Sequence, residues 1–349
     1  LASRMPRQRT RQLRGVKPFP SNGGKAERKK MKGFEFFCPT KIICGKHSLD
    51  KLPDELEGRG VAHPLVMTDA GLVKLGVAEK LTRVLDAADV AYDVFDQVPP
   101  DSSMDVVNEV AQLYAAKGCD GFVAIGGGSV IDTTKGAAAS LACEGVDFAT
   151  LQGSEILKAD LPPLIAVPTT AGTGSEVTLV AVVADTRKHA KLSFTSYKLV
   201  PHAAILDPSL TASLPPKLTA TTGMDALTHA VEAYTSIQKN PVSDAFAVKA
   251  IELIAENLPL ACRDGGNVEA RTSLALGSLL AGAAFSNAMV GIVHAIGHSL
   301  GGLCRIPHGQ AMMMLLPHCV RYNLDRGTHT KLYGELLAYA APEKAAQLG

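Results

Sequence analysis

Four histidines and one aspartate in the second half of the chain have the spacing of metal ligands. In TGMDALTHAVEAY, Asp225 and His229 are four residues apart, and in GIVHAIGHSLGG the same spacing separates His294 and His298. Residues four apart lie on one face of a helix. His308 follows in the Pro- and Gly-flanked loop RIPHGQ. Nitrogen and oxygen donors without a thiolate suit Fe²⁺ or Zn²⁺ in a catalytic site that keeps an open coordination position.

The spacing alone leaves two points open. A single histidine is more often a satisfied buried side chain than a ligand, so only the combination of two pairs with a loop histidine favours a metal site. The spacing also does not decide which four of the five residues bind. Histidines near turns or charged stretches, such as His63 and His202, are interpreted as solvated. The seven cysteines are scattered without a CxxC pair, which argues against a disulfide scaffold and a thiolate zinc site.

The first half of the chain alternates strand-length apolar runs with stretches of helical period. Such alternation predicts a parallel sheet covered by helices on both faces, a Rossmann-like α/β domain. In these sheets ligands bind beyond the carboxyl ends of the strands. Helical periodicity covers residues 72–88 and 104–117. The strand-length runs are FEFF (34–37), PLVMTD (64–69), AYDVF (91–95), GFVAI (121–125), PLIAV (163–167) and AAILD (203–207).

The sequence pattern changes from alternating strands and helices to helices alone after a Pro/Ser/Thr-rich hinge, DPSLTASLPPKLT. Strand signals largely stop there, and apolar helical stretches follow that must pack against one another. We therefore predict an α/β domain over residues 33–212 and an all-helical domain over residues 213–349. The chain ends inside an amphipathic stretch, so we expect the helical domain to be incomplete. The helical stretches are 225–234, 241–262, 268–287, 291–303 and 309–323.

A glycine-rich segment follows the apolar run that ends at Ile125. Gly126, Gly127, Gly128 and Ser129 stand between a predicted strand and a predicted helix. Glycines let the backbone approach a pyrophosphate closely, and the helix start offers free N–H groups. The segment is neither GxGxxG nor a P-loop. Taken alone, it fits a phosphate cradle and a tight turn equally well.

Two further segments favour the cradle. Thr169, Thr170 and Thr178 cluster hydroxyls in VPTTAGTGSEVT, after another predicted strand, although Thr/Gly-rich loops are common connectors. Asp69 ends PLVMTD, where a carboxylate can accept from ribose hydroxyls and repel a 2′-phosphate. Taken alone, an aspartate there is more often a helix N-cap.

Composition excludes several classes of protein. The chain is 46% hydrophobic and 20% charged, with a net charge of +1, so it is not disordered, and no overall field points to nucleic acid or a membrane surface. No apolar run reaches the roughly 20 residues of a membrane span. Residues 1–32 carry eleven Arg or Lys and one acid. Such a composition is typical of a targeting segment or a nucleic-acid-binding arm. We interpret these residues as a disordered basic leader. The unpaired cysteines fit the cytoplasm.

Together these segments resemble the iron-containing alcohol dehydrogenase family, often called group III. The resemblance runs from about Phe34 to the end of the chain. The metal ligands that it implies are Asp225, His229, His294 and His308. It places His298 beside the metal, as a candidate for proton transfer. It rests on TDAGL, GGGSVIDTTK, PTTAGTGSE, ILDP, TGMDALTHAVEAY, GIVHAIGHSLGG and PHG.

The resemblance also implies a cofactor site. Asp69 matches the acid that favours NAD over NADP. Asp101 stands where family members often carry Asn, which puts one cofactor contact in doubt. Many members are homodimers joined partly through the N-terminal strand, here FEFFCPT. The other cofactor positions that it implies are Gly126, Gly127, Gly128, Ser129, Thr169, Thr170, Thr178 and Lys191.

The function that the resemblance implies is hydride transfer between NAD and a small primary alcohol, a diol or an aldehyde, at one metal ion. Fe²⁺ is expected, and Zn²⁺ fits the same donors. Three alternatives stay open at this point. Two are enzymes, a hydroxyacid–oxoacid transhydrogenase and a glycerol-dehydrogenase-like enzyme. The third is a non-catalytic NAD-binding protein.

Overall fold

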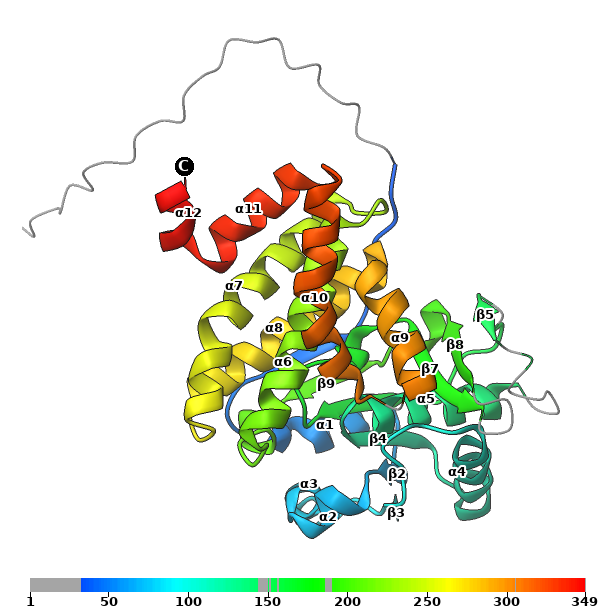
Figure 1. Cartoon of the computed structure of the whole chain (residues 1–349). Helices are drawn as coiled ribbons and strands as arrows, with labels where there is room; N and C mark the ends of the chain where they lie inside the picture. Colours follow the sequence, from blue (N-terminus) through cyan, green and yellow to red (C-terminus); the bar gives the residue numbers. More distant parts are fainter. Residues whose placement is uncertain are drawn as a thin grey trace, which may run out of the picture. The chain divides into compact units, whose positions relative to one another are not determined.

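A computed structural model describes residues 33–143, 150, 152–155, 157–185, 190–304 and 306–348 (Figure 1). The predicted leader, residues 1–32, lies outside the described residues. Contacts divide the chain into residues 1–34 and residues 35–349, and the fold below belongs to the second unit.

The first half of this unit is built on a six-stranded sheet in which all neighbouring strands are parallel. The parallel-sheet prediction is therefore confirmed. Across the sheet the order is β1 (Lys41–Cys44), β9 (Ala203–Leu206), β6 (Leu164–Pro168), β4 (Gly121–Gly126), β2 (Pro64–Met67) and β3 (Asp93–Phe95).

The strand predicted at residues 34–37 is wrong, and the edge strand β1 forms at Lys41–Cys44 instead. A side chain rather than a neighbouring strand satisfies the backbone here. The amide of Phe37 donates to Asn287 Oδ1 at 2.6 Å, and Asn287 Nδ2 donates to the carbonyl of Phe37 at 3.0 Å. Phe36 packs against the ring of Phe246.

The direction in which the chain adds strands to the sheet reverses between β2 and β4. The chain passes from β2 outward to β3, returns past β2 to β4, and then continues the opposite way to β6 and β9. A parallel sheet leaves a crevice at such a reversal, beyond the carboxyl ends of the two strands. Asp69 follows β2, and the glycine segment follows β4. Two of the predicted cofactor elements therefore lie at this crevice.

Helices cover both faces of the sheet, as predicted. Alternation along β4 is typical of the whole sheet: Val123 and Ile125 pack with α1 and α3, whereas Phe122 and Ala124 pack with α4 and α5. The helix predicted over residues 72–88 is two helices, because Gly76 adopts a positive φ of 68° between them. The helices are α1 (Leu52–Glu57), α2 (Ala70–Lys74), α3 (Val77–Ala87), α4 (Met104–Lys117) and α5 (Gly128–Ala142).

A second, three-stranded sheet was not predicted from the sequence. It consists of β5 (Gly153–Ser154), β8 (Ala190–Thr195) and β7 (Val180–Asp185), and β7 and β8 pair antiparallel. Side chains of β7 alternate between buried and half-buried, so a period-two signal was present in VAVVAD. This hairpin carries Lys191.

The second half of the unit is helical, and no strand occurs in the described residues after β9. Three of its helices, α6, α7 and α8, meet through alanines, among them Ala226, Ala247 and Ala281, whose small side chains allow close approach. The helices are α6 (Pro216–Thr235), α7 (Pro241–Arg263), α8 (Val268–Ala288), α9 (Ile292–Cys304), α10 (His308–Asp325), α11 (Thr330–Ala340) and α12 (Pro342–Leu348).

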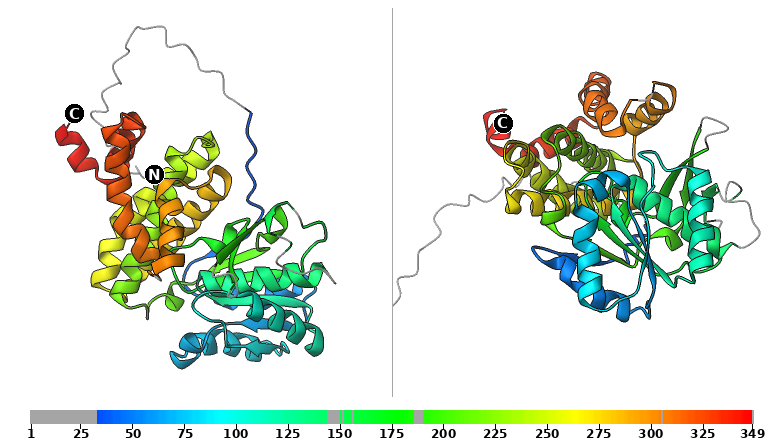
Figure 2. Two further views of the ribbon diagram at one scale, coloured as in Figure 1. Left: turned by 45° about the vertical axis from the view of Figure 1, so that its right-hand side comes forward. Right: turned by 90° about the horizontal axis from the view of Figure 1, so that it is seen from below.

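Helix α8 joins this bundle to the sheet. Leu279 and Ala283 pack with Leu206 of β9 in one buried cluster, and Figure 2 shows the bundle gathered beside the sheet. A Cβ on Gly174 would lie 2.6 Å from the Cα of Gly282, so the loop after β6 touches α8 backbone to backbone. Among the described helices, none alone is long and apolar enough to cross a membrane; α8 and α9, bent by 102°, pass that test only as a pair.

Candidate metal and cofactor site

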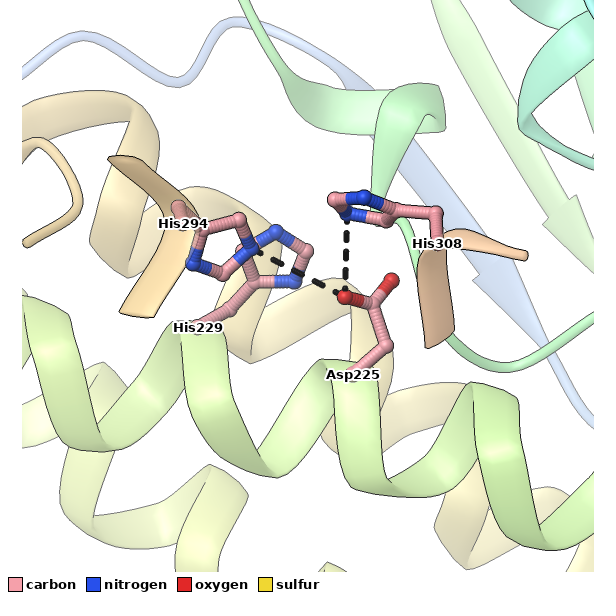
Figure 3. Close-up of side chains that lie close together, drawn as sticks. All are labelled: Asp225, His229, His294 and His308. Atoms are coloured by element: carbon pink, nitrogen blue, oxygen red, sulfur yellow. Dashed lines mark ion pairs between the residues drawn. The ribbon is translucent and has the colours of Figure 1, made fainter. Parts of the chain in front are cut away.

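Four of the five predicted metal-binding side chains converge. Asp225 and His229 lie on successive turns of α6, His294 comes from α9, and His308 is the first residue of α10 (Figure 3). One potential ligand atom of each lies within 4.8 Å of those of the other three. The helical spacing predicted the two residues of α6, and the fold brings the other two helices to them.

The contacts within this group leave buried polar atoms unsatisfied. His308 Nε2 lies 3.3 Å and His294 Nε2 lies 3.7 Å from Asp225 Oδ1. Asp225 Oδ1, His229 Nδ1 and His294 Nε2 are buried and make no hydrogen bond with the described residues. Buried polar atoms without partners cost free energy. A cation between these atoms would satisfy them together.

Glu232 supports the group from behind, and sequence reasoning missed it. Its carboxylate accepts from His294 Nδ1 at 2.6 Å and from the amide of Val293, also at 2.6 Å. Carboxylates that hold the second ring nitrogen of a histidine ligand fix its tautomer and orientation. A signal was available, because Glu232 stands seven residues after Asp225 and three after His229, on the same face of α6.

Burial and mutual charge set the pKa values here. Burial would raise the pKa of Asp225, but the charges of His229 and His308 outweigh it and hold this pKa well below its usual range. Burial lowers the pKa of His229 to about 3. Burial would also lower the pKa of His294, but Asp225 and Glu232 raise it to about 9. The group therefore offers one carboxylate, one neutral imidazole and one imidazole held between two acids.

His298 lies next to the four converging residues and outside the set whose ligand atoms meet. Its ring centroid is 5.8 Å from that of His294 and 5.3 Å from that of His308. Loss of hydration, together with the charges of His308 and His294, lowers its pKa to about 4. Its imidazole is therefore neutral near pH 7.

The glycine segment is packed tightly against the threonine-rich loop that follows β6. Helix α5 begins at Gly128, directly after β4. A Cβ on Gly127 would meet Thr170 at 3.3 Å, and one on Gly128 would meet Thr173 at 2.7 Å. A side chain at Gly128 would therefore displace Thr173, and one at Gly127 would fit only after a small shift of Thr170, whether or not a phosphate also approaches them.

The predicted threonines differ in accessibility. Thr169 and Thr178 are both 2% exposed, whereas Thr170 is half-buried beside Gly127. Thr178 Oγ1 accepts from Lys135 Nζ at 3.1 Å. Of the three, only Thr170 is partly accessible to solvent.

Two polar residues of α5, the buried Lys135 and the half-buried Asp132, tie this helix to the threonine-rich loop and the start of β7, and sequence reasoning missed them. Lys135 is fully buried, and its Nζ donates to the carbonyl oxygens of Thr178 and Val180 at 2.8 and 2.9 Å. Asp132 Oδ1 accepts from Ser175 Oγ at 2.5 Å. The spacing of Asp132 and Lys135, on one face of an otherwise apolar helix, was the available signal.

The remaining cofactor candidates lie around the crevice. Asp69 caps α2 by accepting from the amide of Leu72 at 2.9 Å, so the N-cap reading of this residue is correct. Lys191 Nζ is 2.7 Å from Asp101 Oδ1. Ser129 Oγ donates to the carbonyl of Pro100, next to Asp101. The charge of Lys191 also reaches His298, which places this end of the crevice near the histidines.

Comparison with known proteins gives the family of this chain. The sequence profile described as "Iron-containing alcohol dehydrogenase" matches residues 39–208, and that described as "Fe-containing alcohol dehydrogenase family, C-terminal" matches residues 219–348. The chain belongs to the iron-containing alcohol dehydrogenase family. It is accordingly an oxidoreductase of the alcohol dehydrogenase type, as predicted, and the three alternative functions are not favoured.

Individual members are similar over most of their length. The 1,3-propanediol dehydrogenase of Citrobacter freundii is 43% identical over 293 residues, which cover 83% of this chain and 76% of that protein. The NAD-dependent methanol dehydrogenase of Bacillus methanolicus is 36% identical over 317 residues, 89% of this chain and 83% of that protein. A crystal structure of a 1,3-propanediol oxidoreductase superposes with a TM-score of 0.84 at 40% identity, over 90% of this chain and 84% of that one.

Proposed function

We propose that this iron-containing alcohol dehydrogenase exchanges a hydride between NAD and a small primary alcohol or diol. We further propose that Asp225, His229, His294 and His308 hold the metal ion. The observation that carries this is the convergence of four donors, three of which have buried atoms that make no hydrogen bond to any residue that the structure describes.

The donors fit such an ion by their chemistry. Three imidazoles and one carboxylate, without sulfur, suit Fe²⁺ or Zn²⁺. We propose Fe²⁺, in keeping with the family. When bound, the metal supplies Lewis acidity that lowers the pKa of the substrate hydroxyl. Glu232 keeps His294 turned toward Asp225 through its 2.6 Å contact with His294 Nδ1.

The cofactor is proposed to bind at the crevice between β2 and β4. The glycine segment from Gly126 to Ser129 and the N-terminus of α5 would receive the pyrophosphate. Thr169, Thr170 and Thr178 would form the adjoining wall, the two buried ones through their backbone. Asp69 would disfavour the 2′-phosphate of NADP, and its role as a helix cap leaves one carboxylate oxygen for the ribose.

Two residues are proposed to act between the cofactor and the substrate. Lys191 would leave its ion pair with Asp101 and bind the cofactor instead. Both side chains are accessible, since 34% of the Lys191 surface and 73% of the Asp101 surface is exposed. His298, with a neutral imidazole beside His294 and His308, would take the proton that the alcohol releases.

Three further features remain proposals. The domain boundary is placed near residue 212, between the two segments that match the family profiles. The chain is proposed to dimerise through the extended segment FEFFCPT, which is not paired in the sheet; Asn287 already holds the backbone of Phe37, so a second copy would pair with the other residues of this segment. Seven cysteines without a disulfide are compatible with the cytoplasm.

A substrate series tests the proposed reaction. NADH formation would be followed by absorbance with primary alcohols from ethanol to hexanol, with 1,3-propanediol and glycerol, and with a small hydroxyacid. We expect turnover with at least one primary alcohol or diol, with NAD preferred to NADP. Turnover only with a hydroxyacid, or none with any member of the series by Fe²⁺-loaded protein, would contradict the proposal.

A further inference from the structure

A second group of ligand-type side chains lies at the other end of the sheet. His63 stands immediately before β2, Asp93 opens β3, and Cys119 stands two residues before β4. The register explains why they meet: Leu65 pairs with Asp93, and Pro64 pairs with Gly121. In a parallel sheet the amino ends of neighbouring strands share one edge. These three residues are therefore brought together by strand pairing.

The three side chains are close enough to share one ion. One potential ligand atom of each, an imidazole nitrogen, a carboxylate oxygen and a thiol sulfur, lies within 4.8 Å of the other two. His63 Nε2 is 3.0 Å from Asp93 Oδ2. Cys119 is 8% exposed, and the side chains of His63 and Asp93 are 32% and 25% exposed. The group is thus partly enclosed, with one side open for an ion to enter.

The backbone that carries His63 is fixed to the chain next to Cys119. Asp120 accepts from the amides of Ala62 and His63 at 2.8 and 2.9 Å, and its own amide donates to the carbonyl of His63 at 3.1 Å. The amide of Cys119 donates to the carbonyl of Tyr114. The backbone of two of the three donor residues is therefore fixed before any ion binds, which lowers the ordering cost of binding.

We propose that His63, Asp93 and Cys119 form a second metal site, which takes a divalent ion of the Zn²⁺ class. One nitrogen, one oxygen and one sulfur donor, completed by water, match the ligands that Zn²⁺ and Co²⁺ accept. The scattered cysteines argue against a site built from several thiolates, whereas this site needs only one. On binding, a metal–sulfur bond replaces the S–H bond, and the thiol proton passes to solvent.

A neighbouring lysine, Lys117, pairs with the carboxylate of this group. Lys117 Nζ lies 2.9 Å from Asp93 Oδ1, and 49% of the Lys117 side chain is exposed. A divalent ion would displace this ammonium group, which is free to turn into solvent. Lys117 is therefore a competitor for Asp93, and its removal should strengthen metal binding.

The location makes the role structural. The site ties together the amino ends of β2, β3 and β4, whereas the glycine segment and Asp69 follow the carboxyl ends of β4 and β2. An ion there would cross-link three strands without touching the catalytic centre. This inference is independent of the proposed function, because it uses neither Asp225 nor any of its neighbours.

Cobalt spectroscopy separates this site from the catalytic centre. The full chain would be stripped of metal and titrated with Co²⁺. The catalytic group offers only nitrogen and oxygen donors, so a sulfur-to-cobalt charge-transfer band reports a cysteine site. We expect one such band in the wild type and none in Cys119→Ser. The matched control is Cys304→Ser, an exposed thiol, which should keep the band.

Two more variants make the outcome decisive. His63→Gln should raise the dissociation constant of the sulfur-bound Co²⁺ by at least about tenfold. This variant keeps the proposal testable if Cys119→Ser does not fold. Lys117→Gln should lower that dissociation constant, because it removes the cation that competes for Asp93; a group that only packs the sheet and binds no metal does not predict this change. Absence of the band from the wild type, its persistence in folded Cys119→Ser, or unchanged affinity in His63→Gln would overturn the proposal.

Discussion

Replacing Glu232 tests whether a residue that touches neither substrate nor the proposed ion controls the metal centre. Its carboxylate is 5% exposed and accepts from His294 Nδ1 and from the amide of Val293, both at 2.6 Å. Glu232→Ala leaves both donors buried without a partner. His294 is then free to rotate away from Asp225.

The size of the effect follows from these contacts. A buried hydrogen bond to a charged group contributes about 1.5–3 kcal/mol. Loss of a supporting carboxylate lowers the metal affinity of other histidine sites by about 10–100-fold. As a free energy, this factor is close to the contribution of the hydrogen bond. We therefore expect Glu232→Ala to weaken metal binding by about 10–100-fold. Glu232→Gln, which keeps the shape and one acceptor, should fall between this variant and the wild type.

The assay is chelator competition for Fe²⁺ or Zn²⁺, with the KM for NAD measured at saturating metal. The matched control is Glu335→Gln, since Glu335 also accepts from a side chain of the bundle, Tyr234, at 2.9 Å but outside the centre. This control should leave metal affinity unchanged. If folded Glu232→Ala bound metal as tightly as the wild type, the positioning role of Glu232 would be refuted.

Three other predictions concern the cofactor, the proton and the fold. Asp69→Ser keeps a helix-capping oxygen and removes the charge, so kcat/KM with NADP should rise relative to NAD; an unmoved ratio would reduce Asp69 to a cap. His298→Ala should lower kcat by about 10²–10⁴-fold with metal content intact, and parallel loss of metal would make His298 a ligand instead. Burial raises the pKa of Glu176 from its ordinary 4.5 to about 7. Between these values the folded chain keeps a proton that the unfolded chain has lost, so the free energy of unfolding falls as pH rises. Glu176→Gln has no group that titrates at this position. From pH 5 to pH 7 its free energy of unfolding, measured by denaturant titration, should therefore rise relative to that of the wild type by up to about 3 kcal/mol. Equal changes of this free energy with pH in the two proteins would contradict the prediction.

Periodicity and spacing were enough to predict the main elements. Helical spacing predicted that Asp225 and His229 share a face, and apolar runs located five strands of the parallel sheet. Spacing could not predict that α9 and α10 meet α6, because that depends on packing between distant segments. Only the resemblance to the family selected His308 over His298; in the structure His308 belongs to the group whose ligand atoms lie within 4.8 Å of one another, and His298 lies beside that group.

The misses have physical causes. FEFF has the composition of a strand, but Asn287, 250 residues later, takes the hydrogen bonds of Phe37. Glu232 and Lys135 were passed over because a charged residue on a helix is usually solvated, and their burial depends on partners from other elements. His63 is predicted to be solvated because it stands near a turn, whereas the register of β2 and β3 brings it to Asp93.

Metal removal and restoration test the central claim most directly. Protein stripped by a chelator would be assayed for NADH formation with 1,3-propanediol, then reloaded with Fe²⁺, in the wild type and in His294→Ala. We predict that stripping abolishes turnover, that Fe²⁺ restores it in the wild type, and that folded His294→Ala neither retains the ion nor recovers activity. Full turnover by the stripped wild type, or full metal content and activity in His294→Ala, would contradict the assignment of this site.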